Sequence, residues 1–569
     1  MGGIVARVPV DLLCLGDLYE DAQGRLSPFT GTGQSVPAMT NAPLSRRAIL
    51  RAGGLGAALG TLGPFLPVGG TTAAAADPDP TIELADIQGN VLAGFNKDHQ
   101  RLLFLRFGET AAARRWLAAV VEQVATADEV LRFNQLFADA RSRRGSEANV
   151  PTSQWLNVAL TATGLGRLGA GTAGFPDAFR QGMAARAGRL GDDDASAPAR
   201  WVGPFAGGVD GLLLLAADSA GALARLVADQ VLALQQAGIA VAFDQAGDTR
   251  ADQPGHEHFG FRDGISQPGI RGVTARQNPA DPDQGLPGQD LLWPGEFVVG
   301  YPTQIARPEP GQDTNDQPGP LSRSGPSWTR NGSYLVFRRL RQDVSGFRAF
   351  VAATAAAEGI PADLMGAKLV GRFPSGAPLE SGGDDPAHLD PSTINDFEFG
   401  ADPDGRVVPR AAHIRKVYPR DSRTRDGGES ETQTHRLLRR GIPYGPSYDG
   451  TPASAAVDRG LLFLCYQSSI ERQFEFVQSR WVNDDDFPRR GDGVDPVISQ
   501  ARGNRSFTLP GGRPDHIALL QRFVTTTGGA YLFQPSISAL RQLAAGTTVD
   551  DAGPPRNGQG QGQGQGPPP

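Results

Sequence analysis

Short hydrophobic runs alternate with longer amphipathic stretches in the first half of the chain. Between the runs, residues 111–130 and 221–237 carry apolar side chains at helical spacing, and residues 163–168 predict a short helix. The runs have strand length and occupy residues 102–107, 155–160, 211–216 and 241–243. This strand and helix alternation predicts an α+β domain with a ferredoxin-like sheet.

A second set of elements with the same design follows a segment rich in proline, glycine and aspartate at residues 269–330. Helices are predicted at residues 344–358 and 470–481. Strands are predicted at residues 333–338 and 460–466 and, as a pair, at 522–525 and 529–533. We place the domain boundary near Trp293. The fold class is therefore two α+β domains, residues 77–292 and 293–548, each with an antiparallel sheet and peripheral helices, packed sheet to sheet.

Both ends of the chain depart from this pattern. Ser-Arg-Arg-Ala-Ile-Leu at residues 45–50 is a twin-arginine pattern. It is followed by a weakly hydrophobic stretch and then by four alanines at residues 73–76. We therefore predict a twin-arginine signal peptide at residues 39–76, a true start at Met39, and a mis-assigned extension at residues 1–38. Residues 549–569 belong to a Gly/Gln/Pro repeat, which predicts a disordered tail.

Composition excludes several classes of protein. The 569 residues, 39% of them hydrophobic, provide enough chain for two domains and tails. A net charge of -7 gives no indication of a nucleic-acid partner. No apolar run is long enough for a stable membrane anchor. If Cys14 is removed with the N-terminus, Cys465 is the only cysteine and an intramolecular disulfide is excluded.

Three segments far apart in the sequence carry the candidate chemistry. His413 begins the run His-Ile-Arg-Lys, Asp263 lies in Gly-Phe-Arg-Asp-Gly-Ile-Ser-Gln-Pro at residues 260–268, and Arg439 lies in Leu-Arg-Arg-Gly. A neutral imidazole can ligate a haem iron. A carboxylate can take a proton from hydrogen peroxide, and a guanidinium can stabilise the charge that builds as the O–O bond breaks. A lone histidine, an Asp-Gly turn or a single arginine is more often structural, but the three segments together favour a functional site.

In order and local sequence, these segments resemble the dye-decolourising peroxidase family. The resemblance covers roughly residues 86–540 and includes Asp-Ile-Gln-Gly-Asn-Val-Leu at residues 86–92. It implies one haem b per chain, held in the C-terminal half, with His413 as the proximal iron ligand. Asp263 would be the distal acid-base residue and Arg439 the distal arginine, which also contacts the haem. The family resemblance further implies a peroxidase that reduces hydrogen peroxide and oxidises bulky aromatic donors, such as dyes and phenolics, in one-electron steps.

Other residues near these motifs are secondary candidates. His435 precedes Arg439 by four residues and is the main rival of His413, with a haem propionate as its other possible contact. Arg415 is a second candidate for a propionate. His256 and His258 lack a third metal ligand nearby, so we expect them to support the Asp263 loop. The acceptor for the second ring nitrogen of the proximal histidine stays open among Glu471, Gln473, Asn483 and Asp484.

Two alternatives to the peroxidase remain. One is an exported protein that handles haem or releases its iron, as deferrochelatases do on the same fold, and the other is a non-enzymatic module with an empty cleft. The twin-arginine pattern predicts the Tat export machinery as a partner and a periplasmic or secreted location. Electrons from bulky donors would pass through surface aromatic residues, with packing as the competing role for each: Trp328, Tyr334, Tyr418, Tyr444, Tyr466 and Trp481. The physiological donor, Mn(II) oxidation and the oligomeric state stay open.

Overall fold

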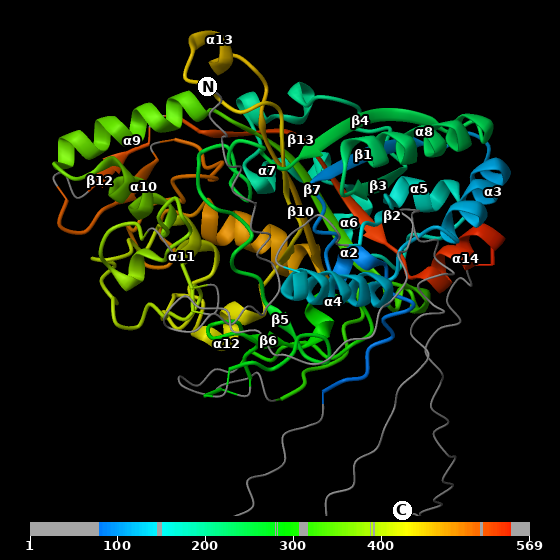
Figure 1. Cartoon of the computed structure of the whole chain (residues 1–569), viewed down its shortest axis with the longest axis horizontal. Helices are drawn as coiled ribbons and strands as arrows, with labels where there is room; N and C mark the ends of the chain where they lie inside the picture. The colour runs from blue at the N-terminus through cyan, green and yellow to red at the C-terminus, as the bar shows by residue number, and fades with distance from the viewer. Residues whose placement is uncertain are drawn as a thin grey trace, which may run out of the picture.

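The computed structural model describes residues 79–144, 151–278, 280–281, 283–306, 317–386, 389–390, 393–503, 505–512, 516–519 and 521–547. The predicted extension, signal peptide and C-terminal tail lie outside these residues, as does His388. In Figure 1 the strands run through the middle of the molecule, with α9 and α10 on one side and α3, α8 and α14 on the other.

The N-terminal half forms four antiparallel strands in the order β4-β1-β3-β2. Its helices are α3 (Thr110–Val121), α4 (Ala127–Arg144), α5 (Ala162–Arg167) and α8 (Ala220–Gln236). The strands are β1 (His99–Arg106), β2 (Gln154–Leu160), β3 (Gly211–Ala217) and β4 (Ala240–Asp248). Every residue of β3 is buried, as its continuous apolar run predicts.

The C-terminal half repeats the arrangement with the strand order β13-β7-β10-β8, and β9 also pairs with β10. Helices α9 (Val344–Glu358) and α10 (Ala362–Val370) lie beside it. The strands are β7 (Ser333–Gln342), β8 (Leu438–Arg439), β9 (Ile442–Tyr444), β10 (Gly460–Gln467) and β13 (Val524–Gln534). Both halves thus have a ferredoxin-like strand order, and the predicted α+β fold class is confirmed.

The two halves share one continuous nine-stranded sheet instead of two separate ones. Leu160 of β2 pairs with Phe533 of β13 and joins the halves edge to edge. The other edges also approach each other, because Gly247 of β4 has no side chain. A Cβ atom there would lie 2.6 Å from Ile442 of β9. The predicted face-to-face packing of two sheets is therefore corrected to an α+β barrel.

Three predicted elements differ in detail. Residues 111–130 form the whole of one helix and the start of another, α3 and α4, because the N–H of Ala125 between them donates to Leu156 of β2. The segment predicted as helix 470–481 contains two π-helical stretches, Ile470–Phe474 and Val477–Val482. The predicted strand pair at 522–533 is the single strand β13, with a bulge between Thr526 and Gly528 that the glycine accommodates.

Remaining short elements lie in the connections. Helices are α2 (Gly89–Leu92), α6 (Asp177–Gln181), α7 (Ala187–Leu190), α11 (His413–Val417), α12 (Glu429–Gln433), α13 (Pro452–Ala455) and α14 (Ile537–Ala545). Strands are β5 (Gly269–Ile270), β6 (Leu291–Leu292), β11 (Ser506–Thr508) and β12 (His516–Ala518). Within the described part of the chain, no helix has both the length and the hydropathy that a membrane span needs.

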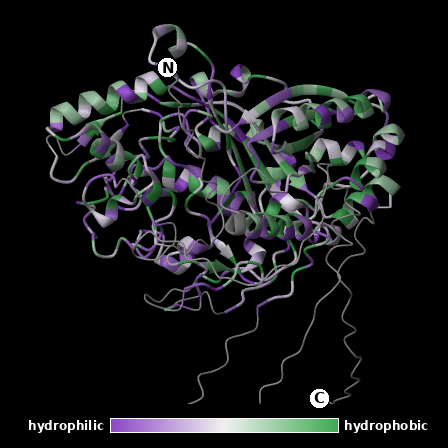
Figure 2. Cartoon of the chain, viewed as in Figure 1, coloured by the Kyte–Doolittle hydropathy of each residue, from purple (hydrophilic) through white to green (hydrophobic). Residues whose placement is uncertain are grey.

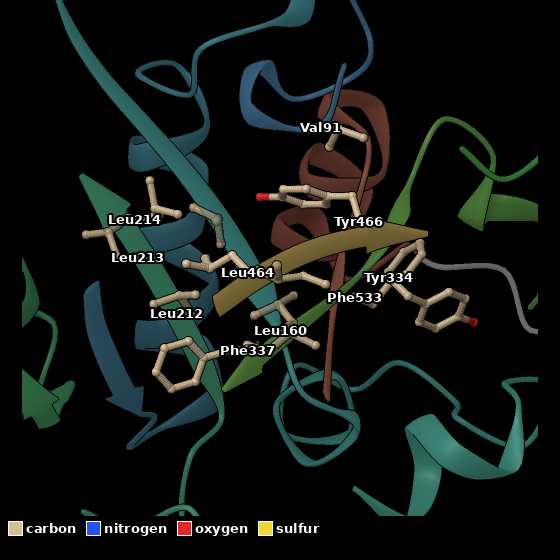
Figure 3. Packing of buried hydrophobic residues seen from close by; sticks show 14 of the residues in the cluster. Val91, Leu160, Leu212, Leu213, Leu214, Tyr334, Phe337, Leu464, Tyr466 and Phe533 are labelled. Carbon is tan, nitrogen blue, oxygen red and sulfur yellow. The ribbon is translucent and has the colours of Figure 1, made fainter. Parts of the chain in front are cut away.

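The main core lies along the shared sheet. In Figure 3, Leu212 of β3 lies beside Phe337 of β7, and both belong to the same cluster as Leu464 of β10. Figure 2 shows that α8, by contrast, carries both hydrophobic and hydrophilic residues, as a helix on the surface of a sheet should. Asn90 of α2 connects the halves through polar contacts: its N–H donates to Asn157 of β2, and its side-chain amide donates to Tyr466 of β10 at 3.2 Å.

Candidate active site

Asp263 lies in a loop between β4 and β5 that backbone hydrogen bonds hold in place. Its N–H donates to the carbonyl of Gly255 at 3.0 Å, and the N–H of Arg262 donates to Pro374 at 3.1 Å. Gly264 has φ +79°, a value that other residues rarely adopt. Its N–H donates to the Asp263 carboxylate at 2.6 Å. The Asp-Gly turn and the presentation of the carboxylate are therefore one structural feature.

Arg439 reaches this loop from β8, which pairs with β10 at the edge of the sheet. The Gln267 side chain accepts the backbone N–H of Arg439 at 3.1 Å and donates to the backbone carbonyl of Arg439 at 2.9 Å. The amide thus makes the same two backbone hydrogen bonds that a neighbouring strand would make. The guanidinium donates to the carbonyl of Ser266 at 2.9 Å. One of its nitrogens lies 3.4 Å from the Asp263 carboxylate. Ser266 and Gln267 of the motif thus position Arg439 beside Asp263.

Asp263 and Arg439 line one cavity of about 200 Å³. About a third of each side chain is exposed, 35% and 34% respectively, so the pair is accessible to a small molecule. Residues of the N-terminal half, including Asn96, Lys97 and Gln100, line the same cavity. The cavity lies where the two halves meet and has ample room for hydrogen peroxide. His413 is not among its lining residues.

His413 begins α11 and is paired with a buried carboxylate. Its Nδ1 lies 2.8 Å from Asp495, whose side chain is fully buried. Asp495 also accepts the N–H groups of Val497 at 2.8 Å and Ile498 at 2.9 Å. Burial opposes ionisation of Asp495, but His413 and these N–H groups outweigh it, so the pKa of the carboxyl is lowered. Nδ1 of His413 therefore carries the proton that it donates to Asp495.

The other ring nitrogen of His413, Nε2, has no partner among the described residues. A histidine that donates through one nitrogen to a carboxylate, with the other nitrogen free, has the arrangement of a metal-ligating imidazole. This donor set fits the iron of a haem.

Asp495 was not among the acceptors that the sequence suggested. Each of those side chains is engaged elsewhere: Glu471 accepts the N–H of Ala178, Gln473 donates to Glu296 and Arg436, Asn483 donates to Leu190, and Asp484 pairs with Arg425. Asp495 lies 82 residues after His413. Its one local signal is the run Gly-Asp-Gly-Val-Asp-Pro at residues 491–496, which resembles an ordinary turn.

Arg415 corrects a second expectation. Its side chain is 1% exposed, pairs with Asp402 at 3.1 Å, and donates to the carbonyls of Val408 and Asp402. Burial lowers its pKa to about 10, although Asp402 opposes the shift. This buried guanidinium is directed at the protein and does not fit a propionate contact. On the other side of α11, Lys416 donates to the Asp484 carbonyl at 2.7 Å and to Gly493, near Asp495. Both cations anchor the helix that carries His413.

Loss of Arg415 is expected to destabilise the fold. Arg415→Met leaves the Asp402 carboxylate without its buried partner, so the free energy of unfolding should fall by about 3–5 kcal/mol. Arg406→Met is the matched control, because Arg406 is 76% exposed and lies 3.9 Å from Asp404; it should change stability by less than about 1 kcal/mol. Urea unfolding measures both. If Arg415→Met left the stability unchanged and weakened haem binding, Arg415 would contact a haem propionate after all.

His435 does not fit the role of rival ligand. The ring is buried and stacks on Phe476 with centroids 3.8 Å apart. Its Nδ1 lies against the carbonyl of Arg472, and its Nε2 lies 3.2 Å from Glu431. Since both nitrogens have protein partners, neither is available for iron or a propionate. The spacing to Arg439 was misleading because residues 438–439 form a strand, not a continuing helix.

His256 and His258 support the Asp263 loop, as expected. Nδ1 of His256 lies 2.9 Å from the carbonyl of Pro254, and Nε2 of His258 lies 2.9 Å from that of Tyr444. Burial lowers the pKa of His258 to about 4, so its ring is neutral. Over the described residues there is no group of three side chains suited to a metal ion.

Packing accounts for most of the aromatic residues named above as electron-transfer candidates. Tyr334, Tyr444, Tyr466 and Trp481 are each no more than 3% exposed, so none of them is a surface residue. Trp328 and Tyr418 are partly exposed. Of the six aromatic residues proposed to pass electrons from bulky donors, only these two reach the surface.

A continuous apolar cluster connects the two sides of the candidate site. It includes Phe259 and Phe261 beside Asp263, Ala411 beside His413, and Val494 and Val497 beside Asp495. Sequence neighbours of Asp263, His413 and Asp495 thus contribute to one buried apolar cluster.

Two family models match the chain. The DyP dimeric alpha+beta barrel domain matches residues 86–251, and the C-terminal domain of Dyp-type peroxidases matches residues 306–514. Together they cover more than half of the chain. The chain belongs to the dye-decolourising peroxidase family: it is a peroxidase, and its cofactor is haem.

Relatives and solved structures agree with this membership. Peroxidase 2 of Mycetinis scorodonius is 33% identical over 491 residues, which cover 81% of this chain and 87% of the relative. Multifunctional dye peroxidase DyP2 of an Amycolatopsis species is 32% identical over 481 residues, 81% of this chain and 96% of the relative. The structure of an ancestral D-type dye decolorizing peroxidase matches with a TM-score of 0.70 and 32% identity, over 82% of this chain and 100% of that one.

Proposed function

We propose that this peroxidase binds one haem b per chain, reduces hydrogen peroxide, and oxidises bulky aromatic donors such as dyes and phenolics by one-electron steps. The observation that carries the proposal is the cavity that Asp263 and Arg439 share. The solved complex of a similar dye-decolorizing peroxidase with 2,6-dimethoxyphenol, 30% identical with a TM-score of 0.67 over 81% of this chain and 100% of that one, supports the donor class.

Each residue has a defined task in this proposal. His413 would hold the iron through Nε2, oriented by the Asp495 carboxylate. When bound, the haem supplies the redox chemistry that peroxide cleavage and one-electron oxidation require. Asp263 accepts a proton from peroxide through its carboxylate. Arg439 directs its guanidinium into the same cavity and stabilises the negative charge that develops on oxygen.

The alternative role, iron release from haem, has weaker support. A deferrochelatase of Yersinia pestis is 34% identical over 187 residues, which cover 33% of this chain and 34% of the relative. Steady-state turnover of an anthraquinone dye with peroxide separates the two roles. A peroxidase decolourises the dye, and its haem keeps the iron. An iron-release protein instead produces free protoporphyrin and does not decolourise the dye. No turnover of any aromatic donor by the haem-loaded protein would refute the proposal.

We also propose export by the Tat pathway, a periplasmic or secreted location, and a domain boundary near Trp293. The boundary falls between the two family matches. Export should depend on Arg46 and Arg47, and mass spectrometry of the exported protein should find an N-terminus close to Asp77. Replacement of both arginines by lysine should retain the protein in the cytoplasm. A mature protein that begins at Met1 or Gly2 would contradict the export proposal.

A further inference from the structure

A second cavity shares no lining residue with the candidate active site. It has a volume of about 420 Å³ and opens to solvent between β7, β13 and the segment before β3. Its lining side chains are Ala195, Arg200, Val202, Arg339, Arg341, Asp458, Thr525 and Thr527. The cavity is cationic, since it gathers three guanidinium groups and a single carboxylate.

The strand geometry explains why the arginines converge. Arg339 and Arg341 are two residues apart on β7, so their side chains project from the same face of the sheet. Thr525 of β13 lies opposite Arg341 in the strand pairing. The N–H of Val202 donates to the carbonyl of Thr527 at 2.7 Å, so the segment before β3 is hydrogen-bonded to β13 beside the cavity.

Only one of the arginines is neutralised by the protein. Arg339 pairs with Asp458 at 2.6 Å and donates to Gln245 and Thr527. Arg200 and Arg341 have neither an ion pair nor a side-chain hydrogen bond with any residue that the structure describes. Both side chains are exposed, so each guanidinium can present its planar fork of donors to an oxyanion that enters the cavity.

The cavity also has apolar lining residues. These are Ala195 and Val202, and Val202 is 42% exposed, which makes it one of the few large hydrophobic side chains open to solvent in the described part of the chain. The volume lies in the range of small-molecule sites and is far larger than one inorganic oxyanion requires. A ligand that fills the cavity therefore needs an apolar body as well as a charged group.

We propose that this cavity binds a small organic anion, with its oxyanion group between Arg200 and Arg341 and its apolar body against Ala195 and Val202. Carboxylates, sulfonates and phosphate esters share this chemistry. Binding needs neither peroxide nor Asp263, so the inference stands apart from the proposed catalytic function.

Isothermal titration of the haem-loaded full chain with naphthalene-2-sulfonate, at fixed ionic strength, tests the inference. Arg200→Ala and Arg341→Ala are each expected to weaken binding at least tenfold. Arg115→Ala, which removes an exposed arginine of α3, is the matched control and should bind as the wild type does. Equal affinity of the wild type and the Arg200→Ala Arg341→Ala double variant would overturn the site, as would an equal loss in Arg115→Ala.

A second titration tests the apolar half of the cavity. Val202→Ser should weaken naphthalene-2-sulfonate at least threefold and leave inorganic phosphate unchanged, because phosphate has no apolar body. An equal effect on both ligands, or tighter binding of phosphate than of the sulfonate by the wild type, would overturn the assignment to organic anions. Haem absorbance and peroxide-dependent oxidation of a small neutral phenol should be unchanged in every variant, which verifies the fold. Where an alanine variant fails this check, Arg341→Gln and Arg200→Gln replace it.

Discussion

His413→Ala is expected to purify without tightly bound haem, whereas His435→Ala should retain it. Among the described residues Nε2 of His413 has no partner, and a buried carboxylate lies against its Nδ1, which are the features of a metal-ligating imidazole. Both nitrogens of His435 contact the protein instead. The measurement is the ratio of Soret to protein absorbance after haem supplementation and gel filtration. Retention of a normal five-coordinate haem spectrum by His413→Ala would refute the assignment.

Asp495→Asn provides the graded control for this experiment. The amide keeps the shape of the carboxylate but removes the charge that favours the proton on Nδ1. Loss of such a supporting acceptor typically costs 10–100-fold in metal affinity or activity, so haem should be retained but more weakly than in the wild type. A haem affinity equal to that of the wild type would show that Asp495 only packs against His413.

The motif residues were predictable because their local sequence carries a backbone requirement. The Asp263 turn needs a glycine at 264 with positive φ, and the same nine-residue run supplies Gln267, whose amide holds Arg439. Consecutive residues of one run therefore form the turn and also hold Arg439. His413 was proposed from the resemblance of its His-Ile-Arg-Lys run to the family, and in the structure the Arg415 and Lys416 that follow it anchor its helix.

The partners of those residues were not predictable, because they depend on contacts between distant segments. Nothing local marks Asp495 as the acceptor for His413. Nothing local indicates that Arg415 faces Asp402 instead of a cofactor, since a buried and an exposed arginine look alike in one sequence. His435 shows the limit of spacing arguments: a separation of four residues brings side chains together on a helix but not across the turn into β8.

The fold shows the same division. Apolar runs located the long strands β1, β3, β7 and β10, because buried strands need continuous hydrophobic residues. β13 was predicted as two strands, 522–525 and 529–533, but the strand continues between them through a bulge at Thr526 and Gly528. Strands β8 and β9 have only two and three residues and leave no periodic pattern. The joining of the halves into one sheet rests on a single residue pair, Leu160 with Phe533, which no pattern could reveal.

Asp263→Asn and Arg439→Leu are expected to slow the reaction with peroxide in different ways. Asp263 acts as a base only when it is ionised, so the wild-type rate falls in acid while that of Asp263→Asn stays low throughout. Loss of a positioned base typically costs 10²–10⁴-fold, so the ratio of wild-type to mutant rate should be largest at high pH and approach one in acid. Stopped-flow mixing with peroxide, followed through the haem spectrum at several pH values, gives the ratio.

Arg439 should behave otherwise, because its guanidinium stays charged over the whole range. Arg439→Leu therefore removes charge stabilisation at every pH, at a typical cost of 10²–10³-fold. Arg439→Lys separates charge from geometry: it keeps the cation but loses the fork that contacts both Ser266 and Asp263. Its rate should lie between those of the wild type and Arg439→Leu at each pH. Identical pH profiles for Asp263→Asn and Arg439→Leu would show that the two residues act as one unit, and the separate roles assigned to the carboxylate and the guanidinium would be wrong.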